Sequence, residues 1–234
     1  HWLKAYLVPE AGRYAQGTHL INLLRLDKGE KVNAILSIKS FDENLQLLFA
    51  TKKGVLKKTD LKEFDNPRQG GILAIKLRDG DEVVDVKLCG YGMQFILGSK
   101  NGRAVKFLES NVRAMGRSAV GVRGMKFVDD EVVGMEISRD DAYLLTVTEN
   151  GRGKRTIIEK YRLINRGGKG VLNMKITEKT GQVIGIKTVK DNDEVMCITE
   201  KGQVIRLNVD NIPAIGRHTQ GVRLVRLKED DKVA

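Results

Sequence analysis

Arginine and lysine are the residues whose number and spacing in this sequence point to chemistry. The 234 residues include 41 Lys and Arg against 30 Asp and Glu, which gives a formal net charge of +11. Ammonium and guanidinium groups hold phosphate oxygens through charge-assisted hydrogen bonds. A surface with this excess of positive charge favours a polyanionic partner, most often a nucleic acid.

The charges are sorted along the chain in a recurring order. Residues 100–126 contain seven Lys and Arg and a single acidic residue, and residues 149–170 contain seven against two. The turns between other predicted strands are acidic instead, as at residues 79–82. We expect the acidic turns to lie toward the axis of the fold and the basic segments to form its perimeter. The alternative is that such runs are ordinary solvated surface.

The basic segments supply the candidate phosphate contacts. Within one of them, Arg166-Gly167-Gly168-Lys169 would let backbone amides approach a phosphate between two cations, although a flexible glycine turn is the alternative. Arginines also recur about every 50 residues, so several parts of the chain could share one bent duplex. The predicted DNA-binding residues are Arg68, Arg103, Arg113, Arg117, Arg123, Arg152, Lys154, Arg155, Arg162, Arg166, Lys169, Arg217 and Arg223.

The aromatic residues favour duplex DNA over a single strand. Phe, Trp and Tyr make up 5% of the chain, and most lie inside predicted strands, as Phe49, Phe95 and Phe107 do. Proteins that bind single strands need exposed aromatic platforms on which bases stack. Because no helix-turn-helix or RNA-binding signature is visible either, we expect a duplex held through its phosphates with little base reading.

Other chemistry finds no support in the sequence. Residues 151–156 lack the spacing of a nucleotide-binding loop, and the three histidines are scattered away from metal-ligand spacing. Tyr161 lies between two cations but has the same place in its repeat unit as Phe64, which predicts packing rather than a cleavage nucleophile. Cys89 and Cys197 lie in apolar stretches and are expected to be buried thiols of a cytosolic protein. No apolar run approaches the ~18 residues of a membrane helix.

A repeat of about 50 residues organises the chain. Tight turns place glycines at positions 54, 102, 151 and 202, and a second set of glycines follows at 71, 121, 170 and 221. In the second unit we expect strands at 72–77, 83–88, 94–98 and 103–107. Four strands in about 50 residues are typical of a propeller blade.

The predicted fold is therefore a single all-β domain of propeller-like architecture. Residues 1–16 would end a blade, 221–234 would begin a closing blade, and the repeat units between them are 17–70, 71–120, 121–169 and 170–220. The number of blades, five or six, stays open. The chain starts without a Met and is expected to be a piece of a longer protein, so flanking sequence could also complete both ends.

Several stretches resemble a known family. Trp2-Leu3-Lys4-Ala5-Tyr6, Gly153-Lys154-Arg155-Thr156 and residues 216–223 are similar to the C-terminal domain of DNA gyrase A subunits and, more loosely, of their topoisomerase IV counterparts. The resemblance implies a β-pinwheel, whose blades exchange strands and whose basic rim bends and wraps duplex DNA for strand passage. It also implies a non-catalytic, cofactor-free domain of a cytoplasmic, ATP- and Mg²⁺-dependent type IIA topoisomerase. The implied partners are an ATPase subunit together with the rest of the A subunit.

One motif departs from the family. Gyrases carry a box similar to Gln-Arg-Arg-Gly-Gly-Lys-Gly in the first blade, whereas the best matches here are residues 165–170 and, less well, 66–71. The box could lie upstream of His1 or be absent, and its absence would favour a decatenating or relaxing enzyme over a supercoiling one. The alternatives from other classes are a protein-interaction propeller of the kelch or WD type and a propeller enzyme with polar ligands on its axis.

Overall fold

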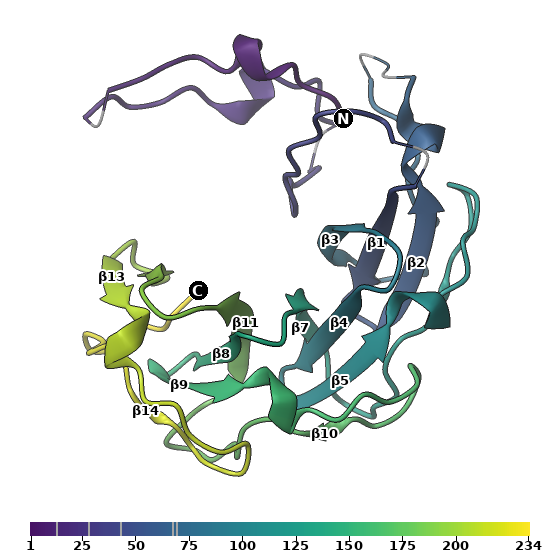
Figure 1. Ribbon diagram of the computed structural model, residues 1–234. Coiled ribbons are helices and arrows are strands. Elements are labelled where there is room, and N and C mark those ends of the chain that lie inside the picture. Colours follow the sequence, from purple (N-terminus) through teal and green to yellow (C-terminus); the bar gives the residue numbers. More distant parts are fainter. Residues whose placement is uncertain (13, 28, 43, 67, 69) are drawn as a thin grey trace.

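The computed structural model describes residues 1–12, 14–27, 29–42, 44–66, 68 and 70–234. In this part of the chain the strands pair antiparallel into successive sheets, and helical structure consists of short 3-10 turns. Figure 1 shows the sheets following one another around an arc. The all-β, blade-like prediction is therefore confirmed.

The first sheet contains strands from three different repeat units. Its order is β3-β1-β2-β6. The hairpin β1–β2 turns at Gly54, whose φ of +77° is a left-handed conformation that suits glycine. The strands are β1 (Gln46–Thr51), β2 (Val55–Asp60), β3 (Val83–Cys89) and β6 (Val122–Arg123).

The four-stranded arrangement recurs in the next two sheets, and the fourth sheet has only two strands among the described residues. The second sheet has the order β10-β5-β4-β7, the third β11-β8-β9-β14, and the fourth pairs β12 with β13. The strands are β4 (Gln94–Ser99), β5 (Arg103–Leu108), β7 (Val132–Ser138), β8 (Tyr143–Thr148), β9 (Arg152–Ile157), β10 (Val171–Leu172), β11 (Val183–Val189), β12 (Glu194–Ile198), β13 (Val204–Asn208) and β14 (Val222–Arg223).

The blades exchange strands, so a repeat unit is not a blade. Strand β3 pairs with β1 of the preceding unit rather than with β4, and β6 comes from the unit after that. This confirms the strand exchange that the family resemblance implied. A sequence period stays the same whichever neighbour a strand pairs with, so the repeat alone could not reveal the exchange.

The strand expected at 72–77 does not form. In later units the corresponding segment contributes a two-residue strand that pairs with the last strand of an earlier hairpin, as Val122 does with Leu56. Ile72 is the residue that corresponds to Val122, and its partner by the same sequence separation would be Tyr6. Tyr6 lies in the 3-10 turn η1 (Ala5–Leu7) instead of a strand. Residues 72–77 therefore have no strand to pair with.

Three glycines of the second repeated set, Gly121, Gly170 and Gly221, mark a close approach of two strands. A Cβ atom at Gly121 would lie 2.5 Å from the carbonyl oxygen of Leu56, and one at Gly221 would lie 2.5 Å from that of Gly153. Because carbon atoms do not approach a carbonyl oxygen so closely, only glycine lets the short outer strand reach the hairpin beneath it. The repeated glycine in the sequence thus reflects the strand exchange.

The hydrophobic core lies between successive sheets. Phe95 and Phe107 are fully buried, with ring centroids 6.1 Å apart, and Phe49 is also buried, as predicted. Cys89 and Cys197 are buried free thiols, which confirms that expectation. Burial raises the pKa of the Cys89 thiol to about 11.

Aspartates in turns form hydrogen bonds with hairpins of the preceding repeat unit. In three units a turn aspartate accepts a hydrogen bond from the backbone N–H of the residue before a hairpin glycine. These pairs are Asp81 with Lys53 at 2.8 Å, Asp130 with Asn101 at 2.9 Å and Asp231 with Lys201 at 3.2 Å. Each of these turns is therefore bonded to a hairpin of the preceding repeat unit, and in the first two cases the strand that follows the turn pairs in the same sheet as that hairpin.

The segment before Gln46 differs from the later units. Its described residues contain two 3-10 turns, η1 and η2 (Leu20–Asn22), and no strand. The ring of Trp2 packs edge-on against Phe41, with centroids 5.0 Å apart. Of the strands expected in unit 17–70, the structure forms β1 and β2.

Candidate nucleic-acid interface

Three connecting segments run along the outer edges of the sheets. We call residues 112–123, 161–172 and 212–223 the outer segments. Each forms a parallel bridge with the last strand of a hairpin and then ends in β6, β10 or β14. Figure 1 shows β2, β5 and β9 on the convex side of the arc, away from β3, β7 and β11. The bridges are Ala114 to Lys58, Leu163 to Lys106 and Ala214 to Arg155.

The outer segments carry positive charge without any Asp or Glu. Five of their cations are exposed, and Arg117, Arg166 and Arg217 are half-buried at equivalent positions of the three segments. The exposed cations are Arg113, Arg123, Arg162, Lys169 and Arg223. An acid-free band of this kind raises the local concentration of anions.

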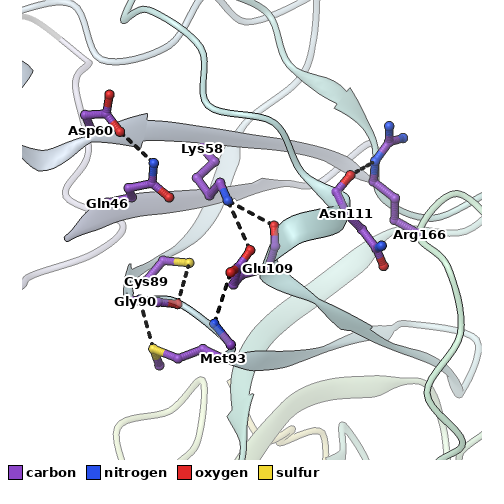
Figure 2. A network of polar contacts seen from close by, with 10 residues as sticks. Gln46, Lys58, Asp60, Cys89, Gly90, Met93, Glu109, Asn111 and Arg166 are labelled. Carbon is purple, nitrogen blue, oxygen red and sulfur yellow. Dashed lines mark hydrogen bonds and ion pairs between the residues drawn. The ribbon is translucent and has the colours of Figure 1, made fainter. Parts of the chain in front are cut away.

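Two arginines connect the outer segments to one another. The Nη1 atom of Arg166 donates to the carbonyl oxygen of Arg123 at 3.0 Å, and its Nε atom donates to that of Asn111 at 2.6 Å (Figure 2). Arg217 donates to the carbonyl oxygen of Leu172 at 2.9 Å. A guanidinium has five N–H groups, so both residues keep donors for a further partner.

The glycine loop at residues 166–169 is partly used by the protein itself. The N–H of Gly167 donates to the carbonyl oxygen of Gly124 at 2.6 Å, and the carbonyl oxygen of Gly168 accepts from the N–H of Lys126. The amide of Gly167 therefore does not contribute to the anion cradle expected from the sequence. Lys169 is exposed beside this loop.

Lys154, a predicted phosphate contact, is fully buried. Its Nζ atom donates to the carbonyl oxygens of Gly216 and Arg217 at 2.6 and 2.8 Å and to Oγ1 of Thr219 at 3.2 Å. Desolvation lowers its pKa to about 8, with a smaller effect from the charge of Arg217. We therefore do not retain Lys154 among the phosphate contacts.

Arg155 is also held by the protein. Its Nε atom donates to the carbonyl oxygen of Ile212 at 2.7 Å, and its guanidinium lies 4.6 Å from the centre of the Tyr143 ring. The Nη1 atom forms an ion pair with Asp191. With its side chain 12% exposed, Arg155 packs the third sheet rather than presenting a free cation.

The remaining predicted residues are Arg152, Arg103 and Arg68. Arg152 donates to the carbonyl oxygen of Gly221 at 2.7 Å and pairs in register with Arg223. Like charges directly opposite each other repel, and a bound anion would relieve this repulsion. Arg103 is exposed and lies opposite Leu172, and Arg68 is exposed outside the outer segments.

Sequence reasoning missed two buried lysines of β2. Lys57 is fully buried at the position of β2 that corresponds to Lys154 in β9, three residues after the hairpin glycine. Lys58 forms a buried ion pair with Glu109, with Nζ 3.2 Å from Oε2 (Figure 2). The signal that could have identified Lys57 is the recurrence of lysine three residues after a hairpin glycine, at Lys57 and Lys154.

Other chemistry is not evident in the described part of the chain. Its His, Cys, Asp and Glu residues form no group of three or more that could hold a metal ion. The hydroxyl of Tyr161 is buried and donates to Oδ1 of Asn173 at 2.6 Å, and burial raises its pKa. The prediction that Tyr161 packs in the core is confirmed. No helix among the described residues has the length and apolar character needed to span a bilayer.

Strand-exchanging antiparallel sheets in an arc, with basic outer edges, define a propeller-like β-domain. A family model described as "DNA gyrase C-terminal domain, beta-propeller" matches residues 2–39, 46–89, 94–139, 142–190 and 193–234. The chain belongs to this family.

Individual relatives agree with the family match. The chain is 44% identical over its whole length to the DNA gyrase A subunit of Salmonella typhimurium, of which it spans 27%. A crystal structure of the C-terminal domain of DNA topoisomerase IV superposes with a TM-score of 0.86 and 28% identity, over 93% of this chain and 68% of that one. The structure of a DNA gyrase A C-terminal domain superposes with a TM-score of 0.85 and 27% sequence identity, over 94% of this chain and 74% of that one.

Proposed function

We propose that this chain binds duplex DNA along its outer segments and bends it around the convex side of the arc. The observation that carries the proposal is the set of three acid-free outer segments on successive sheets, linked by Arg166 and Arg217. Contacts would be made to phosphates, because the Arg and Lys residues recur with the repeat units of the protein. Such regular spacing suits the phosphate backbone and does not read a particular base sequence. A bent duplex would then present one segment for strand passage.

The energetics require several segments to act together. Bending ~20–30 base pairs by 40–90° costs on the order of 1–6 kcal/mol. One exposed ion pair contributes roughly 0–1 kcal/mol. Because no single outer segment offsets the cost of bending, the contacts must be distributed over successive sheets.

In the whole protein, the domain would serve a type II topoisomerase in the cytoplasm. Its partners would be an ATPase subunit together with the remainder of the A subunit. These partners would use ATP and Mg²⁺, whereas this domain would use no cofactor. Supercoiling and decatenation are both compatible with such a domain, and absence of the family's glycine-rich box would favour a decatenating or relaxing enzyme.

A comparison of two triple variants tests the proposal. Arg113→Ala/Arg162→Ala/Arg223→Ala removes exposed cations from all three outer segments, and Arg139→Ala/Lys179→Ala/Lys228→Ala removes as many exposed cations elsewhere. We expect the first variant to lose most affinity for a mixed-sequence duplex in a fluorescence anisotropy titration, and the second to lose little. Equal losses would mean that only net charge matters, and no binding by the wild type would favour a protein-interaction propeller.

A further inference from the structure

The buried lysines Lys57 and Lys154 hold the same part of two different outer segments. The Nζ atom of Lys57 donates to the carbonyl oxygens of Ala74 and Arg117 at 2.5 and 2.9 Å. Lys154 donates to the carbonyl oxygens of Gly216 and Arg217. Each lysine therefore reaches from the middle of a sheet to the backbone of an arginine that lies 60 or 63 residues later at an equivalent repeat position.

Burying an ammonium group is costly unless its N–H groups are bonded. Both lysines have no exposed surface. All three N–H groups of Lys154 have an acceptor, since Thr219 supplies the third, and Lys57 also lies 5.4 Å from the centre of the Phe49 ring. A methionine would fill the same space without the cost, so the loop carbonyls account for a lysine at these positions.

The unit between them provides an internal comparison. Its equivalent position is the buried Val105, which cannot donate a hydrogen bond to the loop. In that unit, two nitrogen atoms of the Arg166 guanidinium donate hydrogen bonds to backbone carbonyl oxygens. Arg217, whose loop is held by Lys154, donates one such hydrogen bond. The guanidinium of Arg117, whose loop is held by Lys57, makes no hydrogen bond within the described part of the chain.

We propose that Lys57 and Lys154 are positioning residues, which fix the backbone at Arg117 and Arg217 so that these guanidinium groups stay available for DNA phosphates. In the unit where valine replaces the lysine, Arg166 is instead bound to the backbone of Asn111 and Arg123. The inference rests on the proposed function for its DNA part. The charged groups that face Lys57 are Glu63 and Arg117, and those that face Lys154 are Arg217 and Lys160.

Hydrogen exchange without DNA tests the positioning directly. We expect Lys57→Met to speed amide exchange in residues 115–120 and Lys154→Met to do so in 215–221, with 164–170 unchanged in both. Val105→Met is the matched control, since it places the same side chain at the equivalent position and should change none of these loops. Unchanged exchange in 115–120 and 215–221 would overturn the inference. Thr219→Val removes one acceptor of Lys154 and offers a milder variant that should loosen 215–221 alone.

Double-mutant cycles in DNA affinity test whether each lysine acts through its arginine. We expect Lys154→Met to weaken duplex binding about threefold in the wild type and hardly at all once Arg217 is replaced by Ala, because coupled residues are not additive. Lys57 and Arg117 should behave alike, and the crossed pairs Lys154 with Arg117 and Lys57 with Arg217 should be additive. Additive effects within the matched pairs would overturn the DNA part. Absence of DNA binding by the wild type would refute the proposed function, while the exchange experiment would still decide the positioning.

Discussion

The guanidinium of Arg166 donates a 3.0 Å hydrogen bond to the backbone carbonyl oxygen of Arg123, which joins the second outer segment to the end of the first. Arg217 makes the equivalent contact to Leu172, at the end of the second. The cations on successive sheets are therefore fixed relative to one another by backbone contacts. A duplex that binds them meets a continuous band instead of independent patches, which determines how binding should respond to salt and to mutation.

Binding should depend steeply on salt. If roughly eight Lys and Arg contact phosphates, the slope of log K against log salt concentration should be about −7, because each contact releases condensed counterions. Titration of a mixed-sequence duplex of about 40 base pairs at four salt concentrations measures the slope. A slope near zero would contradict binding through the outer segments.

Sequence preference should be weak. Contacts to phosphates position a duplex without reading its bases, and the remaining preference should follow the ease of bending. We expect mixed-sequence duplexes to bind within about threefold of one another, with flexible pyrimidine–purine steps favoured. Competition between unrelated duplexes at fixed salt provides the measurement. A strong preference for one short motif would instead indicate base reading.

Bending should be lost before binding. Replacing Arg117, Arg166 or Arg217 alone by Ala should raise Kd by no more than about fivefold, since one ion pair at a solvent-accessible surface contributes roughly 0–1 kcal/mol. The triple variant Arg117→Ala/Arg166→Ala/Lys169→Ala should lose bending while it still binds, because the third outer segment keeps its cations. A FRET bend assay beside an anisotropy titration separates the two effects. If one substitution abolished both, binding would be focused at a single site.

The sequence predicted the hairpins well because their signals are local. Asn101-Gly102 and Asn150-Gly151 lie at hairpin turns in the structure, and the apolar run that precedes the former became the buried strand β4. Pairing between units is not local, so the hairpin signals did not predict the exchange of β3 and β6, which the family resemblance alone implied. The spacing of a repeat does not indicate which repeat unit supplies the remaining strands of a sheet.

The candidate site was predictable as a region but not residue by residue. The outer segments coincide with the basic runs, yet Lys154 and Arg155 lie in a central strand whose two faces are both covered. Alternation identifies the inner face of a strand only when its other face meets water. In β9, where no residue is fully exposed, alternation does not distinguish a buried lysine from a surface one.

The buried ion pair of Lys58 and Glu109 should be a strong local determinant of stability. Both side chains are under 10% exposed (Figure 2). Glu109 also accepts a hydrogen bond from the backbone N–H of Gly92 at 3.0 Å. Glu109→Ala leaves a buried ammonium without its counter-ion and should cost about 3–5 kcal/mol of unfolding free energy. The double variant Lys58→Met/Glu109→Leu should recover most of it. Urea unfolding measures both, and a single variant as stable as the wild type would refute the ion pair's importance.

The stability of the domain should rise with pH above about 8 because of Lys57 and Lys154. Desolvation lowers the pKa of each from the ordinary 10.5 to about 8 in the folded protein. Between these values the unfolded chain binds more protons than the folded one, so increasing pH favours folding. We expect the unfolding free energy of the wild type to increase from pH 8 to pH 10 relative to Lys57→Met/Lys154→Met, in which this contribution is missing. Urea unfolding of both proteins at matched ionic strength gives the difference, and parallel pH profiles would show that the two ammonium groups are not desolvated as the structure indicates.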